Sequence, residues 1–313
     1  MQYRQTTVLG ILALILLCSW GFYAHKRINN AAVFTLPAEL AAFYKQHIDY
    51  ITEKAVDADK RCYVDTLESP RHFIDLDDYE EETPDSVPIH WSKAKEKYSE
   101  RRLLAHGIVP WQIHFTYQKL TTAFRRKDVE AIVRHSADLG HYVADAHVPL
   151  HTTSNYNGQL TGQLGIHAFW ESRLPEMFAE DYNLFVGKAQ YISDPLQLAW
   201  DIIRESHELV DSVLKVEKAL SRQFPKHLQR TYMTRNNVLI ASYSDAYAKE
   251  YHRRLQGMVE RRMRQAIFHI GSYWTSAWID AGQPVLNLKA ELPGPAADTT
   301  LLLKTILGRE EWH

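Results

Sequence analysis

Apolar residues recur with helical rather than strand spacing along most of the chain. Five stretches repeat apolar side chains every three or four residues, which is the spacing of one face of an α-helix. They cover residues 39–56, 112–124, 128–145, 196–220 and 238–280. Alternating patterns typical of strands are scarce, and no segment rich in glycine or proline divides the chain. The pattern therefore predicts one all-α domain of many helices, from residue 20 to residue 286.

The two ends of the chain differ from this central region. Arg4 is the only charge before a ten-residue apolar run, 8–17, which Ser19 and Trp20 follow closely. A positive start, a short apolar core and a small residue near its end are typical of a secretory signal peptide. Residues 1–19 therefore predict export, to the periplasm or the medium. The alternative is an uncleaved membrane anchor, although a span needs roughly 20 apolar residues. Residues 287–313 are expected to form a flexible tail.

Composition and charge exclude several classes of protein. The 36 Lys and Arg residues nearly balance the 38 Asp and Glu residues, which gives a formal net charge of −2. Such a chain has no general attraction for duplex nucleic acid, but a single strand or a small phosphate ester stays open. An apolar fraction of 45% excludes a disordered chain. Cleavage after Ser19 would leave Cys62 as the only thiol, so no disulfide framework is expected.

Histidine forms the most informative pattern. His141 and Asp145 are four residues apart, as are His167 and Glu171, so a helix places each pair on one face. His151 lies between the two pairs. Both pairs have apolar neighbours, and charged groups in such surroundings are costly to bury unless they are paired or bound to metal. Because imidazole and carboxylate are suitable zinc ligands, the spacing predicts a metal site.

Four motifs resemble, in the same order, those of the zinc-dependent phospholipase C family and of the related zinc-dependent single-strand nucleases of the S-one/P-one type. HYVADAHVPLH (141–151) is similar to the H-x3-D-x5-H core, and GIHAFWE (165–171) resembles the H-x3-E/D motif that follows it. WGFYAH (20–25) is similar to the mature start of the family. Residues 55–75 resemble the segment that supplies an Asp and, about 15 residues later, a His. The resemblance extends from residue 20 to about residue 284.

This resemblance implies a cleft that holds three zinc ions. The implied ligands are Asp57, His72, His141 and Asp145 for the first zinc, His151, His167 and Glu171 for the second, and Trp20 (through its α-amine and carbonyl oxygen), His25 and a bridging Asp145 for the third. Asp57 precedes His72 by 15 residues, which favours it over the nearby Asp59, and Asp59 stays an alternative. His147 is out of register with the ligands and is expected to support the site or to lie at the surface.

The same resemblance implies an exported, phospholipase C-like phosphodiester hydrolase in which zinc-activated water attacks phosphorus and Asp57 and Asp145 serve catalysis. Three zinc ions and three carboxylates would leave a charge of about +3 for a phosphate. Glu171, where the family pattern also allows Asp, resembles the phospholipase C branch, although the type of carboxylate does not by itself select a substrate. A phospholipid substrate and transient contact with a membrane surface are therefore expected, and no obligate protein partner is evident. The alternatives are a single-strand nuclease or nucleotidase, for which the arginine-rich stretch 253–264 could form a groove, and a zinc-stabilised binding protein without catalysis.

Overall fold

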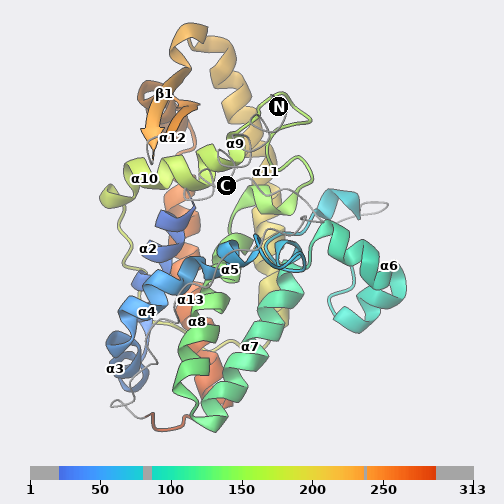
Figure 1. The fold of residues 1–313 in the computed structure, drawn as a ribbon, viewed down its shortest axis with the longest axis vertical. Helices are drawn as coiled ribbons and strands as arrows, with labels where there is room; N and C mark the ends of the chain where they lie inside the picture. The colour runs from blue at the N-terminus through green and yellow to red at the C-terminus, as the bar shows by residue number, and fades with distance from the viewer. Residues whose placement is uncertain (1–20, 80–86, 236–237, 287–313) are drawn as a thin grey trace, which may run out of the picture.

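Long helices packed side by side form the body of the protein (Figure 1). The computed structural model describes residues 21–79, 87–235 and 238–286. Its α-helices are α2 (Phe22–Ala32), α3 (Ala38–Gln46), α4 (Ile48–Glu53), α5 (Asp57–Arg61), α6 (Trp91–His106), α7 (Val109–Arg126), α8 (Val129–Ala146), α9 (Ile166–Ala168), α10 (Leu174–Phe178), α11 (Pro195–Gln223), α12 (Asp245–Arg254) and α13 (Met258–Asp280). Helix α13 packs against α2, α7 and α8, and α7 packs against α8 and α11.

Short helical turns connect these helices, and one small sheet accompanies them. The turns are η1 (Val33–Thr35), η2 (Lys54–Val56), η3 (Ser69–Arg71), η4 (Leu76–Asp78), η6 (Pro149–Thr152), η7 (Phe169–Arg173), η8 (Ala179–Asp181) and η9 (Lys226–Leu228). The sheet is a hairpin of β1 (Arg230–Arg235) and β2 (Val238–Tyr243), which pair antiparallel. The mainly helical class predicted from the pattern is thus confirmed.

Two of the predicted helical stretches are corrected by the structure. Residues 238–280 are not helical throughout, because β2 takes up the first six residues, whereas α12 and α13 lie in the rest. The side chain of Ser244 accepts a hydrogen bond from the backbone of Tyr247 and caps the start of α12, which separates it from the strand. Residues 39–56 are divided by His47, whose backbone (φ −108°, ψ 17°) is not helical. Helix α3 ends just before His47, and α4 starts just after it.

Helix α8 agrees closely with its prediction and carries the first histidine–carboxylate pair. The Asp128 side chain accepts a hydrogen bond from the backbone N–H of Ala131 and caps the helix at its start. The helix ends at Ala146, before Pro149 starts η6. His141 and Asp145 lie on its buried face, in the last two turns. The end of α8 therefore fixes where a site built on this pair has to lie.

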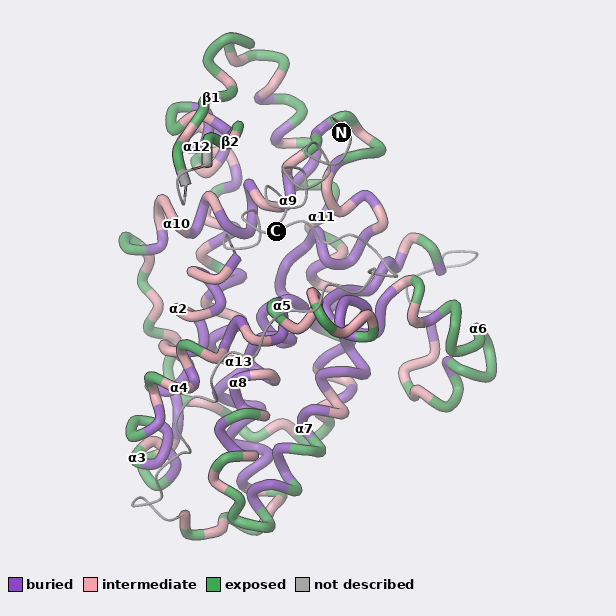
Figure 2. The backbone as a smooth tube through the Cα atoms, viewed as in Figure 1, coloured by how far each residue is buried: buried purple, intermediate pink, exposed green. Residues whose placement is uncertain are grey.

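The buried side of each long helix faces its neighbours, as the purple segments of Figure 2 show. Large aromatic side chains fill this core, and hydrogen bonds fix the polar atoms of two of them. The Trp274 indole donates to the carbonyl oxygen of Ser136 at 3.0 Å, and the Tyr44 hydroxyl lies 2.7 Å from the Ser136 hydroxyl. Within the described residues, no helix combines the length and the apolar character that crossing a membrane requires. The predicted signal segment, 1–19, and the predicted tail, 287–313, lie outside the described residues.

Gly140 gives a test of how closely α2 and α8 approach. A Cβ atom at this position would lie 2.2 Å from Oδ1 of the buried Asn29 on α2. We expect Gly140→Ala to lower the free energy of unfolding by about 1–3 kcal/mol, the usual cost of overpacking a core. The measurement is denaturant unfolding of Gly140→Ala, Asn29→Ala and the double variant. Removing the Asn29 side chain should relieve the clash, so strictly additive effects would contradict this packing.

Candidate metal centre

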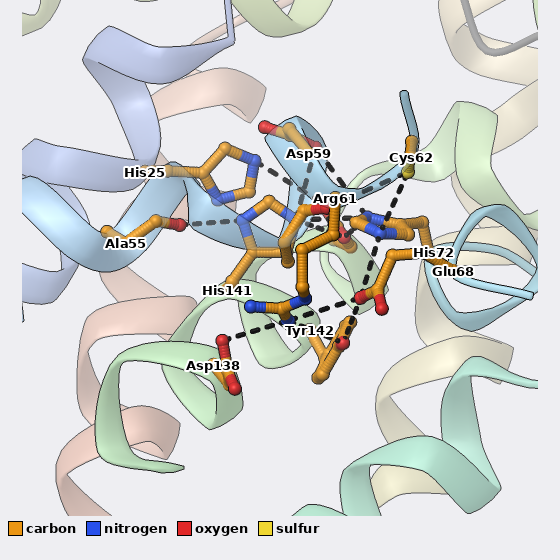
Figure 3. Close-up of polar contacts among 12 residues, drawn as sticks. His25, Ala55, Asp59, Arg61, Cys62, Glu68, His72, Asp138, His141 and Tyr142 are labelled. Atoms are coloured by element: carbon orange, nitrogen blue, oxygen red, sulfur yellow. Dashed lines mark hydrogen bonds and ion pairs between the residues drawn. The ribbon is translucent and has the colours of Figure 1, made fainter. Parts of the chain in front are cut away.

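Four side chains from three segments form a first cluster at the end of α8 (Figure 3). Nδ1 of His72 lies 2.9 Å from Oδ2 of Asp145, and Nε2 of His141 lies 3.1 Å from the same oxygen. The two ring nitrogens are 3.0 Å apart. Asp59, on α5, places Oδ1 3.3 Å from Nε2 of His141. His72, His141 and Asp145 are fully buried and Asp59 is 5% exposed, so four potential ligand atoms converge with little access to water.

Three side chains form a second cluster beside the first. Nε2 of His167 lies 2.7 Å from Oε2 of Glu171, and Nε2 of His151 lies 3.3 Å from the same oxygen and 2.9 Å from Nε2 of His167. Glu171 belongs to η7, a π-helical turn. The sequence predicted an ordinary helical pair, but the wider turn still keeps residues four apart on one face. Such turns are frequent at functional sites.

His25, near the start of α2, lies between the two clusters. Its Nε2 is 3.3 Å from Oδ1 of Asp145 and 3.4 Å from Oε1 of Glu171. Each carboxylate therefore turns one oxygen toward a cluster and the other toward His25. The sequence predicted this bridging role for Asp145 alone, and the structure places Glu171 in the same position. The two clusters and His25 form one continuous site.

Backbone carbonyl groups fix the orientation of two of the imidazole rings. Nδ1 of His141 donates to the carbonyl oxygen of Ala55 at 2.7 Å, and Nδ1 of His151 donates to the carbonyl oxygen of His72 at 2.8 Å. A carbonyl oxygen can only accept, so Nδ1 carries the proton and, in the neutral ring, Nε2 presents a lone pair. This is how proteins commonly orient histidines that bind metal. Both Nε2 atoms face the clusters.

His72 has the opposite orientation, with Nδ1 toward the site and Nε2 toward a buried carboxylate. Nε2 lies 3.7 Å from Oε1 of Glu68 and 3.5 Å from the sulfur of Cys62. Arg61 and Arg71 neutralise Glu68, at 3.2 Å and 2.5 Å, and the Tyr142 hydroxyl donates to it. Glu68 was not among the predicted site residues, although it stands four residues before His72.

The structure brings together seven of the nine predicted ligands; an eighth differs, and the ninth is not tested. The seven are His25, His72, His141, Asp145, His151, His167 and Glu171. Trp20 lies outside the described residues. Asp57 is corrected to Asp59, because the Asp57 carboxylate pairs with Lys54 at 3.0 Å and Lys60 at 3.1 Å, whereas Asp59 lies against His141. Asp57 and Asp59 are two positions apart on α5, so their side chains leave the helix in directions about 200° apart. Only one of these acids can therefore face the cluster.

His147 and the arginine-rich stretch support the fold around the site rather than joining it. His147 is buried, and its Nε2 lies 2.9 Å from Nδ1 of His269. Arg262 is also buried and donates to the carbonyl oxygen of His147 at 2.9 Å. Arg253 and Arg254 both bond to Glu250. These contacts engage Arg253 and Arg254 with their own helix and Arg262 with the end of α8, and they do not favour a single exposed groove for nucleic acid.

The carboxylates and imidazoles of the site shift one another's proton affinities. Burial raises the pKa of Asp145, but His141 and the other nearby histidines outweigh it and hold the pKa well below its ordinary value. Burial likewise raises the pKa of Glu171, and His151 and His167 more than reverse it. Burial lowers the pKa of His141, yet Asp145 and Asp59 raise it well above the ordinary value. Without a bound cation, protonated histidines therefore balance the negative charges of the carboxylates in this site.

The chemistry of the site fits metal ions. Buried groups of His25, His141 and Asp145, of Asp59, His72 and His141, and of His151, His167 and Glu171 each place three ligand atoms within 4.8 Å of one another. Oδ1 of Asp145 is buried and accepts no hydrogen bond from the described residues, which leaves it available to a cation. The clusters can therefore bind metal ions.

In comparisons with known proteins, no family model and no curated protein matches the chain.

The two neighbouring acids of α5 provide a matched pair of variants. We expect Asp59→Asn to weaken metal binding at the first cluster by about 10–100-fold or more, because removing a supporting group alone costs that much. Asp57→Asn should bind metal as the unchanged protein does, since its partners are Lys54 and Lys60. Metal content after dialysis, measured by elemental analysis, compares the two. Loss of metal from Asp57→Asn with retention in Asp59→Asn would restore the original assignment.

The raised pKa values predict how metal binding depends on pH. His72 and His141 have pKa values well above the ordinary one, so near neutral pH the metal-free site holds protons that a metal ion has to displace. We expect metal affinity to fall as the pH is lowered from about 8 to about 6, by about tenfold per unit for each displaced proton. Chelator competition across this range measures the affinity. A metal affinity that does not vary with pH would contradict the conclusion that His72 and His141 hold protons in the metal-free site.

Proposed function

We propose that the protein is a zinc-dependent phosphodiester hydrolase of the phospholipase C type, exported by its N-terminal segment. The observation that carries the proposal is the position of Asp145, whose two oxygens face different ligands, His25 on one side and His72 with His141 on the other. A carboxylate in this position suits a centre with several metal ions close together. Such centres are typical of enzymes that displace groups at phosphorus.

Zinc is the metal that this set of ligands favours. The clusters offer imidazole nitrogen and carboxylate oxygen, which are common donors for catalytic zinc. Asp59, His72, His141 and Asp145 would hold one ion, His151, His167 and Glu171 a second, and His25 with Asp145 and Glu171 a third. The implied contribution of Trp20 to the third ion lies outside the described residues and stays a prediction. The four ordered sequence motifs support the same reading.

Bound zinc ions would supply the positive charge that activates water and stabilises a phosphate in the transition state. The residues of the chain would position the ions and the reacting groups. Ala55 and the backbone of His72 hold the rings of His141 and His151 in place. Asp59, which is 5% exposed at the edge of the first cluster, is the acid that we propose to orient the attacking water and to accept its proton. The sequence resemblance implied this role for Asp57, and we assign it to Asp59 because Asp59 is the acid that lies against His141.

Two other functions make different predictions. A single-strand nuclease or nucleotidase would cleave single-stranded DNA faster than phosphatidylcholine. A zinc-stabilised binding protein would cleave neither. Comparing the two substrates, together with a chromogenic phosphodiester, therefore separates the three functions. We expect hydrolysis of the chromogenic ester, and phosphatidylcholine as the better of the two natural substrates.

Asp145→Asn tests the role that carries the proposal. The amide keeps the size of the side chain but removes the negative charge shared between neighbouring sites. We expect hydrolysis of the chromogenic phosphodiester to fall by about 10²-fold or more, with loss of metal. Asp138→Asn, on the same helix and paired with Arg61 at 3.0 Å, is the control and should keep most of the activity. Normal turnover and metal content in Asp145→Asn would refute the shared site.

A further inference from the structure

The β1–β2 hairpin packs directly against the segment that carries His167 and Glu171 of the second metal cluster. The Tyr243 ring stacks on the Phe169 ring with centroids 3.9 Å apart, and Phe169 lies between His167 and Glu171. The Arg230 guanidinium lies 3.5 Å from the centroid of the Tyr243 ring, and it donates to the carbonyl oxygen of Leu164 at 2.9 Å. The base of the hairpin is thus packed beside the candidate metal centre.

The outer part of the same face is apolar and exposed. Directly opposed residues in an antiparallel pair share a face, and the register pairs Arg230 with Tyr243, Tyr232 with Ala241 and Thr234 with Leu239. Tyr232 and Leu239 therefore lie on the face that carries Tyr243. They are 71% and 66% exposed, and Leu164, at the contact with Arg230, is 62% exposed. Figure 1 shows the hairpin above α10, at the end of the molecule away from α3.

The charge of this region indicates what covers the exposed face. Between Glu217 and Asp245 the chain has five Lys and Arg residues and no Asp or Glu. Four of these cations are exposed and described, namely Lys218, Arg222, Lys226 and Arg230. Exposed apolar side chains on a stretch of chain with an excess of cations match a surface with an apolar interior and anionic headgroups. Leucines cannot stack on bases as aromatic rings do, so a lipid surface fits better than single-stranded nucleic acid.

We propose that the β1–β2 hairpin docks the protein on the surface of an anionic phospholipid bilayer. Tyr232, Leu239 and Leu164 would enter the interface between headgroups and acyl chains, while the neighbouring cations contact the anionic headgroups. Since Tyr243 stacks on Phe169, docking would hold the second metal cluster close to the lipid surface. The inference rests on the proposed function in one respect, because it names the bilayer as the source of the phosphodiester.

Flotation with lipid vesicles tests the docking, using the full protein on ice. We expect it to float with vesicles of phosphatidylcholine mixed with phosphatidylglycerol, and much less with phosphatidylcholine alone. Salt at about 1 M, which shortens the screening length to about 3 Å, should weaken flotation. The variant Tyr232→Ser/Leu239→Ser should lower the affinity for the mixed vesicles by at least about tenfold, since it removes two large apolar side chains from the interface.

A matched control removes one aromatic and one aliphatic side chain elsewhere. Phe34 and Val285 are 60% and 85% exposed. Phe34 lies in η1, just before α3, and Val285 lines a groove with Ala38 and Glu39 at the start of α3. Phe34→Ser/Val285→Ser should float like the unchanged protein. Thermal unfolding and hydrolysis of the chromogenic phosphodiester should be unchanged in both double variants, which separates loss of docking from loss of fold.

Several results would overturn the docking proposal. These are the absence of flotation of the unchanged protein, equal flotation of the hairpin variant, or an equal loss in the control variant. Loss of single-stranded DNA binding in the hairpin variant, with vesicle binding retained, would instead assign the face to nucleic acid. Hydrolysis of the soluble ester without flotation would refute the docking but not the proposed function. Flotation without hydrolysis would refute the proposed function but not the docking.

Discussion

Three carboxylates buried among imidazole rings are the constraint on which the rest of the structure depends. Asp59, Asp145 and Glu171 are all at most 5% exposed, and removing such charges from water is costly unless opposite charge accompanies them. Histidines from α2, α8, η6 and α9, together with His72 just after η3, supply the nearest partners. The start of α2 and the end of α8 therefore have to meet at one place, and the close approach of Gly140 to Asn29 allows them to do so.

Sharing of carboxylates makes the site a single unit rather than a set of separate ligand groups. Asp145 and Glu171 each face a cluster with one oxygen and His25 with the other. A change at either acid therefore alters the charge seen by neighbouring positions. Outside the ligands, Glu68 with Arg61 and Arg71 holds His72, and the stack of Tyr243 on Phe169 braces the turn that carries Glu171.

The sequence predicted the parts of this arrangement that follow from local periodicity. A helix fixes which side chains four residues apart share a face, so the pair on α8 was predictable, as were the limits of that helix. The choice between Asp57 and Asp59 depends on how the short α5 is rotated against α8, which no spacing reveals. The hairpin escaped prediction because its short apolar runs fit a helix as well as a strand, and because its contact with Phe169 joins residues distant in sequence.

Anomalous diffraction from crystals of the zinc-loaded protein, recorded above and below the zinc absorption edge, tests most directly whether these clusters form one metal centre. Zinc peaks are expected at the first cluster, between Asp59, His72, His141 and Asp145, at the second, between His151, His167 and Glu171, and beside His25. Each should lie about 2.0–2.2 Å from its nitrogen and oxygen ligands. A map without zinc peaks at these side chains, or with zinc bound only elsewhere, would contradict it.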